Sequence, residues 1–230
     1  MKRIVVFTGA GVSAESGIKT FRDSGGLWEE HRIEDVATPE AWRRNPGLVL
    51  EFYNQRRKQV LSAMPNAAHL ALKQLEEKFE VQIITQNIDD LHERAGSSKV
   101  LHLHGEIRKA RSSIDPGLVY DIEGESLLTG DCCALGSQLR PHIVWFGESV
   151  PAMEEAILMT SEADVFIAIG TSLEVYPAAS LLLYAPEQAM KVLIDPRASR
   201  DKAGKEFTII AKTAGEGVPE LVHKLLNNYV

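Results

Sequence analysis

Strand-like runs alternate with longer stretches of mixed apolar and charged residues along most of the chain. The runs are short and rich in β-branched side chains, which is typical of buried strands; they cover residues 4–7, 80–85, 100–103, 142–146, 165–169, 192–194 and 207–210. The stretches between them favour helices near residues 47–63, 67–79, 89–95, 152–161, 178–184 and 218–228. Strands that alternate with helices predict an α/β fold, a parallel sheet with helices on both faces.

A glycine pattern, Gly9-x-Gly11-x-x-Ala14, follows the first strand directly. It matches the dinucleotide-binding fingerprint, in which the first glycine makes a tight turn and the second lets a pyrophosphate approach the backbone. Ala14 is small enough for close packing of a helix, whose first N–H groups would face the anion. The pattern predicts a Rossmann-like sheet, although a glycine pair after a strand often serves only as a turn.

The residues after this pattern depart from a hydride-transfer enzyme, because Ser16-Gly17 ends the helix early. A polar loop with Phe21 and Trp28 follows, either a cover over a ligand or a surface loop with its aromatic side chains in the core. Residues 9–18, 20–22 and 26–28 together resemble the signature of the sirtuins, NAD-consuming protein-lysine deacylases. The resemblance implies that NAD is bound by Gly9, Ala10, Gly11, Ser13, Ala14, Thr20, Phe21, Arg22 and Trp28.

Residues 85–92 read Thr-Gln-Asn-Ile-Asp-Asp-Leu-His, at the end of the second strand. From the residues alone, Asp89 could simply cap a helix. The segment is also similar to the second sirtuin motif. That resemblance implies that Gln86 contacts a ribose, Asn87 orients the reacting sugar and Asp89 holds the nicotinamide carboxamide.

His102 and His104 lie on the same side of the third strand, and a lone histidine is usually structural. His104 is nearer the strand end and precedes Gly105, and Leu-His-Gly resembles the third sirtuin motif. The resemblance makes His104 the general base, a role that suits an imidazole near its normal pKa. We expect His102 to be structural.

Residues 140–148 would be read from their own pattern as a core strand. They resemble the sirtuin segment that lines the acyl-lysine tunnel, with Val144 and Phe146 as walls and with Gly147 and Glu148 pairing with the substrate backbone. Residues 170–178 contain small hydroxyl side chains that could bind a ribose or cap a helix. The resemblance assigns Gly170, Thr171 and Ser172 to NAD, and it assigns Leu173, Glu174, Val175 and Tyr176 to the peptide.

Two further positions are matched to the adenosine half of NAD by the same resemblance. Asp195 stands where the family usually has an asparagine, and a carboxylate can still accept a hydrogen bond from a ribose hydroxyl. Ala214 lies in the segment that resembles the adenine-side loop.

We expect a Rossmann-like NAD-binding domain made of residues 1–30, 65–105 and 140–230, and a small domain made of two insertions, 31–64 and 106–139. The sirtuin small domain normally holds zinc with two C-x-x-C pairs, whereas Cys132 and Cys133 are the only cysteines here. We therefore predict no zinc. The second insertion would need a small core, for which we expect Ile114, Leu118, Tyr120, Ile122, Leu127 and Leu128.

Tyr53 and Arg56 are three residues apart on an expected helix, and so lie on one face. Residues 56–58 could be a solvated basic face. The pair also resembles the sirtuin subgroup that removes succinyl and malonyl groups, in which the tyrosine and arginine bind the acyl carboxylate. Ala37 matches the small residue that opens the pocket in that subgroup.

The chain has 230 residues, 44% of them hydrophobic and 25% charged, with a net charge of −7. This acidity argues against a nucleic-acid surface and is compatible with lysine-bearing partners. The first strand begins at residue 4 and no apolar run spans a membrane, so we expect no signal peptide, no membrane partner and a cytoplasmic protein.

The resemblance implies NAD-dependent removal of succinyl, malonyl or acetyl groups from protein lysines. The acyl oxygen attacks the ribose carbon that bears nicotinamide, nicotinamide leaves, and His104 helps a ribose hydroxyl attack the resulting imidate. The products are free lysine and acyl-ADP-ribose. Three alternatives stay open: an NAD-linked oxidoreductase, a sirtuin-type ADP-ribosyltransferase, and a non-catalytic binder of NAD or ADP-ribose.

Overall fold

The computed structural model describes residues 1–19, 31–199 and 204–228. A six-stranded parallel sheet in the order β3-β2-β1-β7-β8-β9 forms its centre. The strands are β1 (Arg3–Thr8), β2 (Glu80–Thr85), β3 (Val100–His102), β7 (Val165–Ile169), β8 (Met190–Ile194) and β9 (Phe207–Ile210). The strand order reverses between β1 and β7, as in Rossmann-like folds, so the expected fold class is confirmed.

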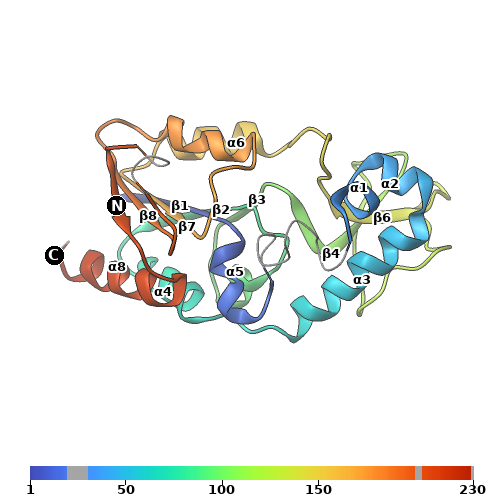
Figure 1. Cartoon of the computed structure of the whole chain (residues 1–230), viewed down its shortest axis with the longest axis horizontal. Coiled ribbons are helices and arrows are strands. Elements are labelled where there is room, and N and C mark those ends of the chain that lie inside the picture. Colours follow the sequence, from blue (N-terminus) through green and yellow to red (C-terminus); the bar gives the residue numbers. More distant parts are fainter. Residues whose placement is uncertain (20–30, 200–203, 229–230) are drawn as a thin grey trace.

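Helices cover both faces of this sheet (Figure 1). Helices α4 (Ala67–Leu75) and α8 (Ala214–Asn228) pack on the face that includes Ile4 and Val6, while α6 (Met153–Ser161) and the 3₁₀ helix η3 (Ala178–Tyr184) pack on the face that includes Val5 and Phe7. Successive residues of β1 thus enter opposite cores. Burial on both faces explains why the central strands are almost continuously apolar.

A small module lies at the other end of the molecule from α8 (Figure 1). It has a three-stranded antiparallel sheet, β5-β4-β6, made of β4 (Gly105–Ser112), β5 (Val119–Asp121) and β6 (Leu139–Ile143). Helices α1 (Ile33–Val36), α2 (Pro39–Arg44) and α3 (Pro46–Ser62) complete it. Leu50 of α3 packs with Ile122 and Leu127, so the two expected insertions share one core.

Two expectations, one for the large domain and one for the core of the second insertion, are wrong. Residues 142–146 do not form a strand of the parallel sheet; β6 ends at Ile143 and pairs with β4 in the small sheet. The side chains of Ile114 and Leu128 are exposed, whereas Leu118, Tyr120, Ile122 and Leu127 enter or border the core as expected. The pairing partner, which a local apolar pattern does not encode, decides which strand belongs to which sheet.

The helices also differ from expectation at several places. Between β1 and residue 19, where the described part of this segment ends, there is no α-helix; residues 10–12 and 14–16 form two 3₁₀ turns that end at Gly17, whose φ is +87°. Helices α1 and α2 lie before residue 47, in a part of the chain where the sequence pattern predicted no helix. Helix α8 begins at Ala214 with Pro219 inside it, η3 is a 3₁₀ helix, and α5 is confined to Leu91–Arg94.

We expect Gly105→Ala to destabilise the protein much more than Gly124→Ala. Both glycines have a left-handed φ, +82° and +84°, so alanine strains the backbone by about 1–2 kcal/mol at either position. Only at Gly105 would the new Cβ overlap backbone, namely the carbonyl oxygen of His142; nothing lies within 4 Å at Gly124. Thermal unfolding measures the difference, and equal melting temperatures would contradict this packing.

Candidate active site

The loops after β1 and β7 touch each other through glycines at the point where the strand order reverses. The N–H of Gly11 donates to the carbonyl of Gly170 at 2.9 Å, and the N–H of Gly9 donates to Ile169 at 3.0 Å. A Cβ on Gly11 would lie 2.6 Å from the Cα of Gly170. Glycine is therefore required at position 11 by a backbone contact within the chain, a different reason from the room for a pyrophosphate that the motif suggested. The helix N-terminus expected to face an anion is absent, because this segment forms 3₁₀ turns.

Ser13, Asn87 and Asp89 form a buried polar cluster beside this contact. The Ser13 hydroxyl donates to Asp89 Oδ2 at 3.1 Å and accepts from the Asn87 amide at 3.1 Å. Burial raises the pKa of Asp89, although hydrogen bonds from Leu91 and Ser13 oppose the shift. Asp89 Oδ1 also accepts the N–H of Leu91, the first residue of α5, although the N-cap residue of this helix is Asp90. Asn87 donates in addition to the carbonyl of Gly9, which ties the β1 and β2 strand ends together.

His104 follows β3 and is oriented by the segment after β2. Its Nδ1 lies 3.0 Å from the carbonyl oxygen of Gln86. A carbonyl oxygen only accepts, so the neutral ring carries its proton on Nδ1, and Nε2 is an acceptor. Burial lowers the pKa of His104 below its ordinary value, despite the opposing hydrogen bond to Gln86. The ring is therefore largely neutral at pH 7 and able to take a proton.

His102 is occupied on both ring nitrogens, by the carbonyl of Asn87 at 2.9 Å and by Glu93 at 2.7 Å. This fits its interpretation as a structural residue. Gln86 uses its amide differently: Nε2 donates to the Thr171 hydroxyl at 3.0 Å and so links the ends of β2 and β7.

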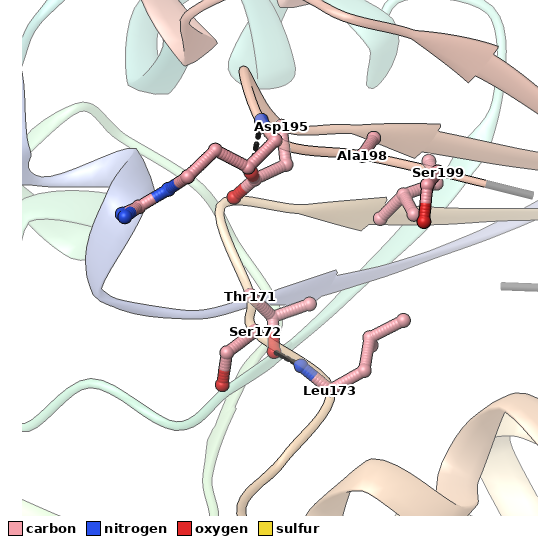
Figure 2. A pocket seen from close by; sticks show the side chains of 8 residues that line it. Thr171, Ser172, Leu173, Asp195, Ala198 and Ser199 are labelled. Carbon is pink, nitrogen blue, oxygen red and sulfur yellow. Dashed lines mark hydrogen bonds between the residues drawn. The ribbon is translucent and has the colours of Figure 1, made fainter. Parts of the chain in front are cut away.

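A hollow lies between the ends of β7 and β8 (Figure 2). It measures about 250 Å³ including space open to solvent, and its lining is Thr171, Ser172, Leu173, Leu193, Asp195, Arg197, Ala198 and Ser199. Asp195 is held in place by accepting the N–H of Arg197 at 2.8 Å. The sequence interpretation missed residues 197–199, although their position just after the apolar run 192–194 could have indicated them.

The N-terminus of α8 is tied to the loop after β1. The carboxylate of Glu15 accepts the N–H of Gly215 at 2.6 Å and the hydroxyl of Thr213 at 3.2 Å. Ala214 is buried between these two residues. The expected adenine-side segment therefore lies against the expected phosphate-side loop. Thr20, Phe21, Arg22 and Trp28 lie outside the described residues.

Tyr53, Arg56 and Ala37 are all buried in the small module near the segment that follows β6. Trp145 Nε1 donates to the Tyr53 hydroxyl at 3.0 Å, and both residues lie in one apolar cluster with Ala37. The side chain of Arg56 is only 5% exposed, so the interpretation as a solvated basic face is wrong for this residue. Burial also raises the pKa of Tyr53, so the phenol keeps its proton at neutral pH.

Residues 144–146 form a bridge between His104 and the small module. The N–H of Val144 donates to the carbonyl of His104 at 2.9 Å, and the N–H of Phe146 donates to the carbonyl of Ala37 at 3.0 Å. The Phe146 side chain is 48% exposed. The general-base candidate and the acyl-pocket candidates are thus connected by three residues of backbone.

Glu148 is the anionic centre of an ion-pair cluster. It binds Arg140 at 2.7 Å and Arg111 at 3.1 Å, and it accepts the N–H of Trp145 at 2.8 Å. Leu173, which lines the hollow, has a left-handed φ of 58°, while Glu174, Val175 and Tyr176 are exposed.

The polar groups at the strand ends suit a ribose and a carboxamide. The side chains of Thr171, Ser172 and Asp195 offer hydroxyl and carboxylate oxygens at the hollow, and Asn87 and Asp89 offer a buried amide and carboxylate.

Among the described residues, no three His, Cys, Asp or Glu side chains are grouped to hold a metal ion. No helix in the described ranges is long and apolar enough to cross a membrane.

The Sir2 family model matches residues 9–177, around all three strand-end segments. The chain belongs to the Sir2 family. A Helicobacter pylori protein named NAD-dependent protein deacylase is 53% identical over 226 residues, which cover 98% of each chain. A Bacteroides thetaiotaomicron protein of the same name is 52% identical over 231 residues, covering 98% of this chain and 99% of the relative.

Solved Sir2 structures agree with this family membership. A Sir2 homologue in complex with NAD superimposes with a TM-score of 0.89 at 40% identity, covering 99% of this chain and 90% of that chain. A Sir2 complex with a p53 peptide and NAD⁺ gives a TM-score of 0.76 at 32% identity, covering 98% of this chain and 92% of that chain.

We expect metal analysis of the purified protein to find no stoichiometric zinc. Cys133 belongs to a hydrogen-bonded cluster in the small module: its Sγ lies 3.1 Å from Ser137 Oγ, which lies 2.9 Å from Ser112 Oγ. Two cysteines adjacent in sequence do not supply the two separated pairs of a structural zinc site. One zinc ion per chain that resists dialysis against a chelator would overturn this prediction.

Proposed function

We propose that this Sir2-family protein removes acyl groups from lysine side chains of proteins, with NAD as co-substrate, and that its preferred acyl groups carry a carboxylate, as succinyl and malonyl groups do. The observation that carries the proposal is the neutral His104 ring, with its Nε2 as acceptor, adjacent in the fold to the buried amide of Asn87 and carboxylate of Asp89. The products would be nicotinamide, acylated ADP-ribose and free lysine.

The residues at the strand ends have separate tasks in NAD binding. Asp89 accepts hydrogen bonds and would hold the carboxamide N–H groups, since a carboxylate has about four acceptor sites and the described residues supply two donors to it, Ser13 and Leu91. Thr171, Ser172 and Asp195 would hold the adenosine ribose. When bound, NAD supplies the glycosidic bond that is cleaved; the chain orients both reactants in a closed cleft.

His104 acts on the ribose. Its Nδ1–H is committed to the carbonyl of Gln86, which fixes the ring and leaves Nε2 to accept the proton of a ribose hydroxyl. The same proton is returned later, so the ring cycles between neutral and cationic forms. The neutral carbonyl partner stabilises the cation less than a carboxylate would, which keeps the ring a neutral base at the start of the cycle.

The acyl pocket is built for a negative charge. Arg56 is a buried permanent cation, and its planar fork of donors matches a carboxylate. Trp145 donates to the oxygen of Tyr53, so this phenol accepts there and uses its own O–H as a donor. Ala37, which is small and lies in the same cluster as Tyr53, would leave room there for an acyl chain. The peptide backbone would add as a strand along Gly147 and Glu148, with Leu173 to Tyr176 on its other side.

We expect His104→Ala to lower the formation of acylated ADP-ribose and free lysine by about 10²- to 10⁴-fold, the typical contribution of general-base catalysis, because the base is lost. In the unmodified enzyme, kcat/KM should fall as the pH drops through the pKa of this ring. Since burial lowers that pKa, the acid limb should lie below the ordinary histidine value of about 6.5. Mass spectrometry of acetyl- and succinyl-lysine peptides with NAD measures both the rate of the variant and the pH dependence of the unmodified enzyme. Undiminished turnover by the alanine variant would contradict the role of His104 as the base.

Arg56→Met should lower desuccinylation about ten- to a hundredfold, from the loss of a charge-assisted contact worth about 1.5–3 kcal/mol, and should largely spare deacetylation. The control is Lys58→Met, which removes one positive charge from the exposed side of the same helix. The two substrates are compared by kcat/KM. Equal losses on both would show that Arg56 does not read the acyl carboxylate, without affecting the proposal of NAD-dependent deacylation.

A further inference from the structure

A pair of buried histidines lies behind the candidate active site and has no part in the chemistry proposed above. His92 belongs to α5 and His69 to α4, and their side chains are 1% and 0% exposed. Their ring centroids are 4.8 Å apart. Two histidines that are removed from water together need a reason, because polar rings are costly to bury without partners.

His92 begins a chain of hydrogen bonds that ends on the active-site loop. Its Nε2 lies 3.1 Å from the hydroxyl of Thr8, at the end of β1. The Thr8 hydroxyl donates to that of Thr85 at 2.8 Å, at the end of β2. The Thr85 oxygen in turn accepts the backbone N–H of Asn87 at 3.0 Å. Three side chains therefore connect α5 to the residue that we propose orients the reacting sugar.

The directions of these bonds fix the tautomer of His92. The Thr8 hydrogen is used toward Thr85, so Thr8 accepts from the ring and His92 carries its proton on Nε2. Its Nδ1 is then an acceptor. His69 is complementary: its Nδ1 accepts the N–H of Asn66 in a capping box, so its Nε2 carries the hydrogen. The two remaining nitrogens, the donor Nε2 of His69 and the acceptor Nδ1 of His92, are buried on neighbouring rings.

The surroundings keep both rings neutral. Burial lowers the pKa of His69 to about 4, against a small opposing effect of Glu93, and it lowers the pKa of His92 well below the ordinary value, with His69 and His102 adding to that shift. Glu93 is already paired with His102. His92 is therefore a permanent neutral donor at physiological pH.

We propose that His92 is a positioning residue for the deacylation site: through Thr8 and Thr85 it fixes the backbone of Asn87, and with it the loop that orients both Asn87 and His104. This inference rests on the proposed function for its kinetic consequence. The same loop supplies the Gln86 carbonyl that holds the His104 ring, so a loop displaced by a fraction of an ångström misplaces the base and the sugar contact together. Misplacement by about 1 Å can cost about a hundredfold in rate.

The test compares His92→Leu, which removes the donor, with His92→Gln, whose amide N–H replaces the Nε2 donor, and with Thr8→Val, which breaks the next link while keeping the shape. We expect His92→Leu and Thr8→Val each to lower kcat about tenfold or more, with the KM for NAD changed by less than about threefold. His92→Gln should recover most of the rate. The double variant Thr8→Val/His92→Leu should be no slower than the slower single variant, because both break one chain.

A second readout is independent of activity. Hydrogen exchange of the Asn87 amide, measured by NMR, should be faster in His92→Leu and Thr8→Val than in the unmodified protein, and slow again in His92→Gln. The matched control is His223→Leu, the same chemical change at an exposed histidine of α8, which should alter neither readout. If the unmodified protein fails to deacylate, the proposed function fails, and amide exchange alone decides the placement of this loop.

Unchanged kcat and unchanged Asn87 exchange in folded His92→Leu would overturn the inference, as would losses that multiply in the double variant. If His92→Leu does not fold, Thr8→Val, which alters little volume, decides the question with the same two measurements. A rate that His92→Gln fails to recover, in a variant with normal stability, would also count against it.

Discussion

The site depends on one close approach between two loops, those that follow β1 and β7. Gly9 and Gly11 of the first loop hydrogen-bond to the backbone at Ile169 and Gly170, at distances that leave no space for a Cβ. Gly170 itself has a left-handed φ of 59°. Because the strand order reverses between β1 and β7, this contact closes the point at which Rossmann-like sheets form their ligand crevice. It also sets the position of Ser13, which joins Asn87 and Asp89.

From that contact the polar groups extend in two directions. Toward β8 they are the oxygens of Thr171, Ser172 and Asp195, which line a hollow that is open to solvent (Figure 2). Toward β2 and β3 they are Asn87, Asp89 and His104; burial raises the pKa of Asp89 and lowers the pKa of His104. A gradient from a wet to a dry end is what a co-substrate with a binding half and a reacting half requires, since charges act more strongly where water is excluded.

Much of the fold could be predicted from the sequence. The runs 80–85 and 207–210 coincide with β2 and β9, because a short β-branched run between turn residues has few other stable states. Residues 142–146 were wrongly predicted to belong to the parallel sheet, because their local pattern does not show that β6 pairs with β4 in the small sheet. The first loop misled in a different way: the glycines were found, but their role is a contact with Gly170, more than 150 residues away in the chain.

Among the site residues too, those marked by local motifs were predicted and those that depend on long-range contacts were not. Motifs indicated Asn87, Asp89 and His104, because strand ends and the polar residues that follow them can be recognised in the sequence alone. The partner of Tyr53, Trp145, and the hydrogen-bond chain of His92 could not be found that way, since both depend on contacts between distant segments. A Leu-His pair on a helix is ordinary in sequence, and the burial of His92 beside Thr8 is what distinguishes this one.

A crystal structure of the protein with NAD and an acyl-lysine peptide tests the central claim most directly, because it locates both reactants relative to the glycine contact. The account predicts the adenosine ribose beside Asp195, the carboxamide at Asp89, and a hydroxyl of the nicotinamide ribose within hydrogen-bonding distance of His104 Nε2. A nicotinamide ribose bound away from His104, or a peptide whose acyl group does not reach it, would contradict the account.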